Sequence, residues 1–404
     1  MFRGLRSKAA VVVVLAVLCV QGCSSSPSEE EERPEPSLSA PYRGNRGYTL
    51  PDSPFTREGT VVTATCNMGA RYVGVSVQAW DPEQWELREE RVFSIPTDAA
   101  FSNVPGFKAV NSPLVDLCGT TQYSSSPYAV DDLEYMTPRI RALFDLTFTR
   151  MAVVLRDSDG KTSHAGFVKS DGNFEDYVRL SEAAGDDEQN AVMAPDGRSV
   201  WFTYTTPTGE HRIGSRSVEG DRHLSDEGPA TGHDLPLAVF GKPPHAVQAN
   251  MVHLAPDGRR LTATVPKIFG HVFDTLDSSA PLTAASVHSA TLLSGCVGIV
   301  GWIGEDRVLC RNQAGSFQAV DARTGRAERA AIAVVRESDG MVAEGMLVSV
   351  DGKRFIVSVH LPNDRHGEWG DQADFRVVST SGGGPATRIS HDSLTNGTVF
   401  LEWW

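Results

Sequence analysis

Basic side chains are scarce in this sequence, and their scarcity argues against nucleic acid as a partner. The 404 residues include 37 Lys and Arg against 51 Asp and Glu, a formal net charge of −14. An acidic surface repels phosphate backbones, so we expect no nucleic-acid partner, while cationic partners remain open.

Motifs that carry common enzyme chemistry are missing as well. The sequence has no Gly-x-Ser-x-Gly elbow, no phosphate-binding glycine loop, no His-Glu-x-x-His helix and no Cys-x-x-Cys pair. Each of these spacings places a nucleophile, an anion cradle or metal ligands together. We therefore predict no catalytic residue, no metal site and no cofactor from motifs.

Long apolar runs are limited to the N-terminus. Three basic residues precede the uncharged run 9–20, which is short for an ordinary membrane-spanning helix and typical of an export signal. The run ends in Val20-Gln21-Gly22-Cys23, which resembles a bacterial lipobox, in which the cysteine receives the lipid. An ordinary secretory signal with an incidental cysteine is the alternative.

The lipobox resemblance implies a signal peptide over residues 1–22 and lipidation of Cys23. Residues 23–57 then form a tether, because the Ser-, Pro- and Glu-rich stretch 24–40 is too polar to fold. Removing the signal's three basic residues leaves 34 basic against 51 acidic residues, a net charge of −17. We expect a protein anchored to the cell membrane by lipid and facing the extracytoplasmic side.

Cysteine is sparse, and its number is consistent with export. Without Cys19, in the signal, and Cys23, four cysteines remain, an even count that suggests disulfides in an exported chain. Three connectivities are possible, and we favour the pairs nearest in sequence. These pairs are Cys66–Cys118 and Cys296–Cys310.

A recurring hairpin is the strongest structural signal. The segments 194–204, 255–265 and 349–359 each place Asp-Gly between two apolar runs, a turn that joins adjacent antiparallel strands. Two weaker copies follow the same pattern. The acidic turn residues, spaced by 51, 61, 49 and 45, are Asp145, Asp196, Asp257, Asp306 and Asp351.

Such spacing is typical of four-stranded propeller blades. The turns resemble those of the TolB-like and WD40-like propeller families, which implies an all-β propeller domain over residues 58–404. The resemblance covers roughly residues 140–390 and implies little about activity, because these folds host many functions.

Both ends of this domain lack a partner strand. Residues 60–66, 71–80 and 86–95 read as three strands, and residues 398–404 read as a single strand. We predict that the C-terminal strand completes the first blade, with Trp403 and Trp404 as packing residues. Residues 97–138, whose best strand signal lies in 108–117, form an insertion or an irregular blade, so we predict six blades with seven as the alternative.

Binding residues are expected in long loops. The loop 361–374 combines an aromatic side chain with acids, a pattern suited to a cation, a sugar or a basic peptide. Its candidate residues are Asp364, His366, Trp369 and Asp371. His233, His245 and His253 match no ligand spacing.

Three functions remain open at this stage. The first is binding of a protein, a peptide or an envelope component through loop faces. The second is a hydrolase or a quinoprotein-like oxidoreductase, for which histidine, arginine and acidic side chains would have to converge in one deep pocket. The third is a structural or sensory lipoprotein without a small ligand.

Overall fold

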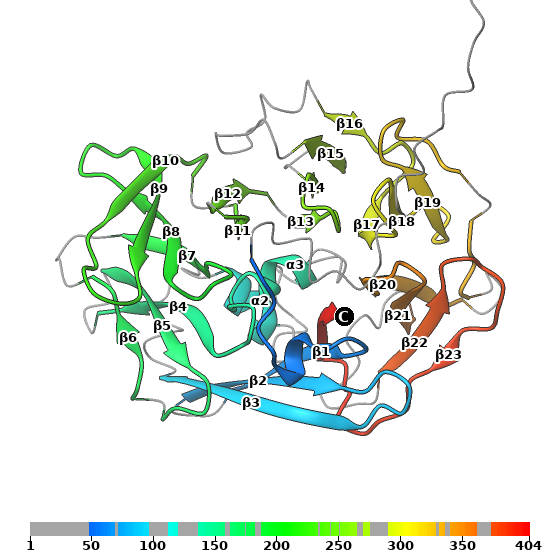
Figure 1. Ribbon diagram of the computed structural model, residues 1–404, viewed down its shortest axis with the longest axis horizontal. Coiled ribbons are helices and arrows are strands. Elements are labelled where there is room, and N and C mark those ends of the chain that lie inside the picture. Colours follow the sequence, from blue (N-terminus) through cyan, green and yellow to red (C-terminus); the bar gives the residue numbers. More distant parts are fainter. Residues whose placement is uncertain are drawn as a thin grey trace, which may run out of the picture. The chain divides into compact units, whose positions relative to one another are not determined.

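The computed structural model describes most of the chain from residue 48 onward. The described ranges are 48–68, 72–96, 112–119, 136–157, 162–173, 175–181, 187–232, 235–242, 244–249, 251–264, 270–274, 290–328, 331–335, 340–361 and 373–404. All of them belong to one compact unit, Ala40–Trp404. This unit is a β-propeller (Figure 1).

In the described ranges, six antiparallel sheets form the blades. Blade 1 contains β24 (Val399–Trp403), β1 (Val61–Met68), β2 (Tyr72–Trp80) and β3 (Leu87–Pro96); blade 2 contains β4 (Arg150–Arg156), β5 (Ser163–Lys169) and β6 (Val178–Arg179); blade 3 contains β7 (Glu188–Met193), β8 (Ser199–Thr205), β9 (His211–Ser217) and β10 (Ser225–Pro229). Blade 4 contains β13 (Met251–Leu254), β14 (Arg260–Thr264), β15 (His271–Asp274) and β16 (Thr291–Leu292); blade 5 contains β17 (Gly298–Trp302), β18 (Arg307–Arg311) and β19 (Phe317–Asp321); blade 6 contains β20 (Val342–Val348), β21 (Arg354–His360), β22 (Asp374–Ser379) and β23 (Thr387–Arg388).

Blades 2 and 5 have three named strands, and isolated bridges supply the fourth position. Phe144 pairs with Met151 of β4, so residues before Asp145 take the innermost place in blade 2. Ile332 pairs with Phe317 of β19 on the outer side of blade 5. Every blade therefore has four strand positions.

The Asp-Gly turns join the first two strands of their blades, as predicted. In three of them the aspartate Oδ1 accepts a hydrogen bond from the backbone N–H two residues later, at 2.8 to 3.0 Å. The glycine that follows each of these aspartates has a φ between +66° and +68°, a conformation that residues with a Cβ disfavour. Asp196, Asp257 and Asp351 are therefore turn residues, as expected.

A two-stranded hairpin explains the longest turn spacing. Strands β11 (Leu237–Phe240) and β12 (His245–Gln248) lie between blades 3 and 4 in the chain. Leu237 packs with the core of blade 3, whereas Phe240 packs with that of blade 4. The hairpin is therefore an insertion that lengthens the interval between Asp196 and Asp257. The described sheets form six blades, as predicted, and the alternative of seven is wrong.

The C-terminal strand closes the ring, as predicted. β24 pairs antiparallel with β1, with Val61 opposite Trp403 and Thr63 opposite Phe400. Trp403 and Trp404 are buried in the same core as Phe400. The innermost strand of blade 1 thus comes from the end of the sequence and its other three strands from the beginning.

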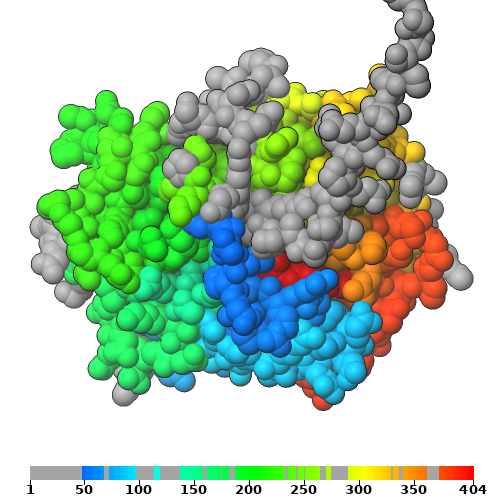
Figure 2. Space-filling view, viewed as in Figure 1, coloured from blue at the N-terminus to red at the C-terminus, as the bar shows by residue number. Residues whose placement is uncertain are grey.

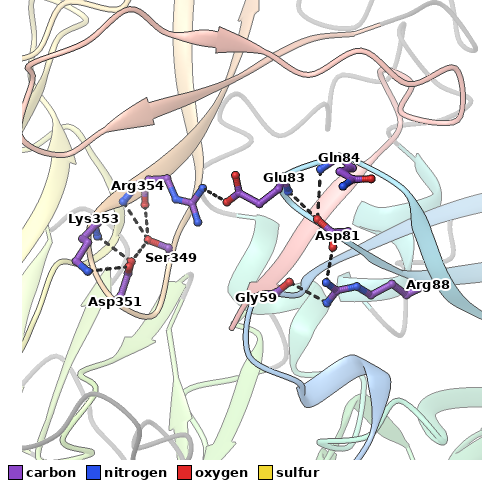
Figure 3. A network of polar contacts seen from close by, with 9 residues as sticks. All are labelled: Gly59, Asp81, Glu83, Gln84, Arg88, Ser349, Asp351, Lys353 and Arg354. Atoms are coloured by element: carbon purple, nitrogen blue, oxygen red, sulfur yellow. Dashed lines mark hydrogen bonds and ion pairs between the residues drawn. The ribbon is translucent and has the colours of Figure 1, made fainter.

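Charged contacts also join blade 6 to blade 1 (Figure 3). Arg354, the first residue of β21, donates to Glu83 at 2.7 Å and lies 4.8 Å from the centre of the Trp403 ring. The backbone N–H of Glu83 donates to Asp81, which also pairs with Arg88. This network connects the turn of the last blade to the β2–β3 loop of the first.

Both expected disulfides are present, at Cys66–Cys118 and Cys296–Cys310. The first attaches the helix α2 (Ser112–Gly119) to β1. The expectation of a strand within 108–117 is wrong over residues 112–117, which are helical. Leu114, Leu117 and Cys118 are buried at a helical spacing of three and four residues.

The packed unit begins earlier than the expected boundary at residue 58. The short helix η1 (Pro54–Thr56) places Phe55 in the core, 5.5 Å from the ring of Phe148. Residues 54–56 therefore belong to the folded unit. Among the described residues, no helix has the length and apolar character needed to cross a membrane.

We predict that Phe400→Ala lowers the free energy of unfolding by about 3–5 kcal/mol. Phe400 is fully buried in β24 and its ring lies 4.9 Å from that of Phe375 in blade 6, so truncation leaves a cavity at the closure. Urea unfolding of the full chain, followed by tryptophan fluorescence, measures the change. The control is Leu292→Ala, at a side chain of a residue that is 47% exposed, and equal losses from both variants would contradict the prediction.

Candidate functional site

The predicted lipidation and binding residues lie outside the part of the chain that the structure describes. These are Cys23, Asp364, His366, Trp369 and Asp371. His233 also lies outside it, while His245 is on β12. His253, whose spacing from the other two histidines matches no ligand motif, is on β13 and reaches the centre of the ring.

A cavity of about 170 Å³ lies at the centre of the propeller. The innermost strands of four blades, β13, β17, β20 and β24, contribute to its wall, together with the helix α3 (Met136–Arg141). Figure 1 shows α3 inside the ring of blades. The described lining residues are Thr137, Pro138, Arg141, Val252, His253, Leu254, Pro256, Val300, Gly301, Trp302, Leu347, Val348, Ser349, Val350, Leu401, Glu402, Trp403 and Trp404.

Strand register shows why two polar groups meet in this cavity. Glu402, His253 and Leu347 each form the second antiparallel pair from the end of their innermost strand, opposite Val62, Thr262 and Ile356 respectively. Their side chains therefore occupy equivalent places in blades 1, 4 and 6. Blades 1 and 4 are three positions apart in a ring of six. The Glu402 carboxyl and the His253 imidazole therefore enter the cavity from opposite sides.

Arg141 holds one oxygen of the Glu402 carboxyl. Its Nε donates to Glu402 Oε1 and its Nη1 donates to the carbonyl of Phe144 at 2.8 Å, while the guanidinium lies 4.6 Å from the centre of the Phe148 ring. Burial raises the pKa of Glu402, and this effect outweighs the opposing influence of Arg141. Glu402 Oε2 is buried and has no hydrogen-bond partner among the described residues.

His253 contributes a second buried polar atom to the cavity. Its Nε2 is shielded from solvent and has no partner in the described ranges, although part of the residue remains exposed. Its backbone carbonyl accepts a hydrogen bond from Trp302 Nε1 at 2.9 Å, which links blades 4 and 5. Burial lowers the pKa of His253 to about 4, so the imidazole is neutral at pH 7.

The two hydroxyl groups on the cavity wall are engaged in structural bonds. Thr137 donates to the carbonyl of Met346 at 3.2 Å, which fastens α3 to β20. Ser349 Oγ donates to Asp351 at 2.6 Å and accepts from the backbone N–H of Arg354. Neither hydroxyl is paired with an imidazole, and no cluster of three metal-ligating side chains occurs in the described ranges.

A second polar network, between blades 2 and 3, contains the residue types of a hydrolytic triad. His164 Nδ1 lies 2.8 Å from Ser181 Oγ, and His164 Nε2 lies 3.3 Å from Asp157. Arg179 and Asp157 both contact His164 Nε2, whereas the single hydroxyl proton of Ser181 is directed to Glu188. Ser181 then accepts from histidine and donates to Glu188 at 3.2 Å, the reverse of the bond that activates a serine nucleophile.

Comparisons with known proteins do not identify a family. No family model matches the sequence, and no curated protein matches it. Among solved structures, a prolyl endopeptidase is 12% identical with a TM-score of 0.37, covering 88% of this chain and 44% of that one. TolB from Acinetobacter baumannii is 11% identical with a TM-score of 0.28, covering 85% and 83%.

A manganese complex of an oligogalacturonate lyase is 9% identical with a TM-score of 0.32, covering 63% of each chain. This chain therefore spans less than two thirds of the length of the endopeptidase and of the lyase. At such low similarity these proteins say nothing about activity, and the propeller assignment depends on the sheet topology itself.

Sequence reasoning missed Arg141 and Glu402, although one signal was available. Glu402 is the single charged residue in the C-terminal strand Val399–Trp403. A carboxyl group within a strand predicted to complete the core indicates a buried partner. Nothing comparable identified Arg141, because its role depends on the path of α3 through the ring.

We predict that His253 makes the protein less stable as the pH falls from 6.5 to 4. The unfolded chain takes up a proton below about pH 6.5, whereas folded His253 stays neutral down to about pH 4, so acid favours unfolding. Over this interval wild type should lose about 3 kcal/mol more than His253→Leu. Urea unfolding at a series of pH values provides the measurement.

His223→Gln is the matched control, because the His223 side chain is 91% exposed and its removal should leave the pH dependence unchanged. Parallel stability curves for wild type and His253→Leu would contradict the prediction.

Proposed function

We propose that this protein is a lipid-anchored, extracytoplasmic propeller that binds an envelope component, a peptide or a protein. The observation that carries the binding role is the central cavity. It gathers polar atoms of Glu402 and His253 that have no partner in the described part of the chain, while the hydroxyls on its wall are bound to the backbone or to a turn carboxylate.

Two features support an extracytoplasmic location. The four cysteines of the domain form two disulfides, which persist in oxidising compartments. The apolar run before Cys23 resembles a lipoprotein signal. Together they favour an exported chain held at the membrane by Cys23.

The side chains in the cavity also bear on the alternative that this propeller is an enzyme. Arginine, histidine and an acidic side chain converge there, the feature expected of a propeller enzyme. However, Glu402 is held by Arg141, and neither wall hydroxyl contacts an imidazole. A serine or threonine nucleophile needs a base within hydrogen-bond reach, so the described residues of the cavity favour binding over covalent catalysis.

We predict that the full-length protein incorporates labelled palmitate in a bacterial host and enters the detergent phase on phase separation. Cys23→Ser should abolish both, because its hydroxyl cannot form the thioether to lipid. Cys19→Ser, which changes the other cysteine of the same segment, should retain both. An unlabelled wild-type protein, or a labelled Cys23→Ser variant, would contradict lipidation at Cys23.

We further predict that the tagged full-length protein captures a specific envelope partner through the loop 361–374. Trp369→Ala should reduce capture at least about tenfold, since aromatic anchors commonly supply much of the binding energy. The control is Tyr72→Ala, which removes an exposed aromatic side chain from blade 1. Capture that saturates with wild type and is unchanged in Trp369→Ala would place the partner elsewhere.

A further inference from the structure

The residues that line the central cavity differ widely in their exposure to solvent. Glu402, at the inner wall, is only 7% exposed, whereas Val350, on the wall beside the turn of blade 6, is 43% exposed. The cavity therefore runs from the surface at that turn to a buried carboxyl. Figure 2 shows the C-terminal strand in red between the N-terminal segment in blue and β20–β21 in orange.

The polar groups at the inner end require hydrogen-bonding occupants. Glu402 Oε2 and His253 Nε2 are both buried without partners among the described residues. Leaving such atoms unpaired costs about 1–3 kcal/mol each, and more for a charged group, so water or a ligand must satisfy them. Arg141 uses Nε and Nη1 in its bonds to Glu402 and Phe144, and its Nη2 has no partner in the described ranges.

The charges of the side chains in the cavity favour a neutral occupant. Arg141 and Glu402 compensate each other, and His253 is uncharged at pH 7. A ligand with a net charge would leave that charge unbalanced away from water or would have to separate the ion pair, and either is costly. Hydroxyl groups avoid both costs, because each can donate to a carboxylate oxygen and accept from a guanidinium.

The size and the walls of the cavity restrict the occupant further. A volume of about 170 Å³ lies below the usual range of about 300–1,000 Å³ for pockets that hold drug-sized ligands. It corresponds to about five or six water molecules at liquid density, which is the scale of a single sugar ring. Trp302, Leu347 and Trp403 supply apolar surface for the carbon skeleton of such a molecule.

We propose that the central cavity binds a small neutral polyhydroxylated molecule of monosaccharide size, with its hydroxyls bonded to Arg141, Glu402 and His253. This inference rests on the binding function proposed above, and it adds a second site, separate from the loop 361–374. Lipid attachment at Cys23 and capture of a partner do not depend on it.

Calorimetric titration of the full chain in detergent tests the inference. Glucose, galactose, mannose and xylose serve as neutral probes, and glucuronate and glucosamine as charged probes. At least one neutral probe should bind saturably at one site, more tightly than every charged probe. Glu402→Gln should weaken it at least about tenfold, because a hydrogen bond to a charged group is lost.

Val350→Trp provides an independent variant if Glu402→Gln disturbs the fold. It places a large side chain at the exposed mouth without altering the buried carboxyl, and it should also weaken binding at least about tenfold. Leu292→Ala, on the outer strand of blade 4, should bind as wild type does. Near-ultraviolet circular dichroism checks the folding of each variant.

Three results would overturn the inference: no saturable binding of any neutral probe at tens of millimolar, tighter binding of a charged probe, or neutral binding unchanged by Val350→Trp. The first of these results would mean that water alone occupies the cavity. Palmitate labelling and partner capture, measured on the same preparations, separate such a failure from a failure of the proposed function.

Discussion

Pairing of β24 with β1 is the constraint on which the rest of the propeller depends. It joins residues more than 330 positions apart and converts a row of sheets into a ring without an open inner edge. The same pairing carries Glu402 into the centre, because it makes β24 the innermost strand of blade 1. The pairing that closes the ring therefore also forms part of the cavity wall.

Arginines at the start of the second strand reinforce alternate joints of the ring. Arg150 of blade 2 donates to the carbonyl of Gly197 in blade 3 at 2.6 Å, and Arg260 of blade 4 pairs with Asp306 of blade 5 at 2.9 Å. Arg354 repeats the arrangement from blade 6 to blade 1, through Glu83. Each of these contacts contributes modestly in water, but their repeated geometry connects neighbouring blades at three of the six joints.

The insertion between blades 1 and 2 contributes the helix α3 to the wall of the central cavity. The disulfide from Cys118 attaches α2 to β1, and Asp116 of α2 pairs with Arg139 of α3 at 2.8 Å. Burial raises the pKa of Asp116 despite this partner. The helix pair is thereby held where Arg141 can reach Glu402.

Local chemistry made the hairpin turns predictable, since Asp-Gly at Asp196, Asp257 and Asp351 specifies a turn wherever the chain places it. Strand pattern and cysteine order likewise sufficed for the closure by β24 and for both disulfides. Helix α2 and the meeting of Arg141, His253 and Glu402 were decided only in three dimensions. Spacing along a chain says nothing of which blades stand opposite each other, so partners drawn from blade 1, blade 4 and an inserted helix become neighbours only once the ring has closed.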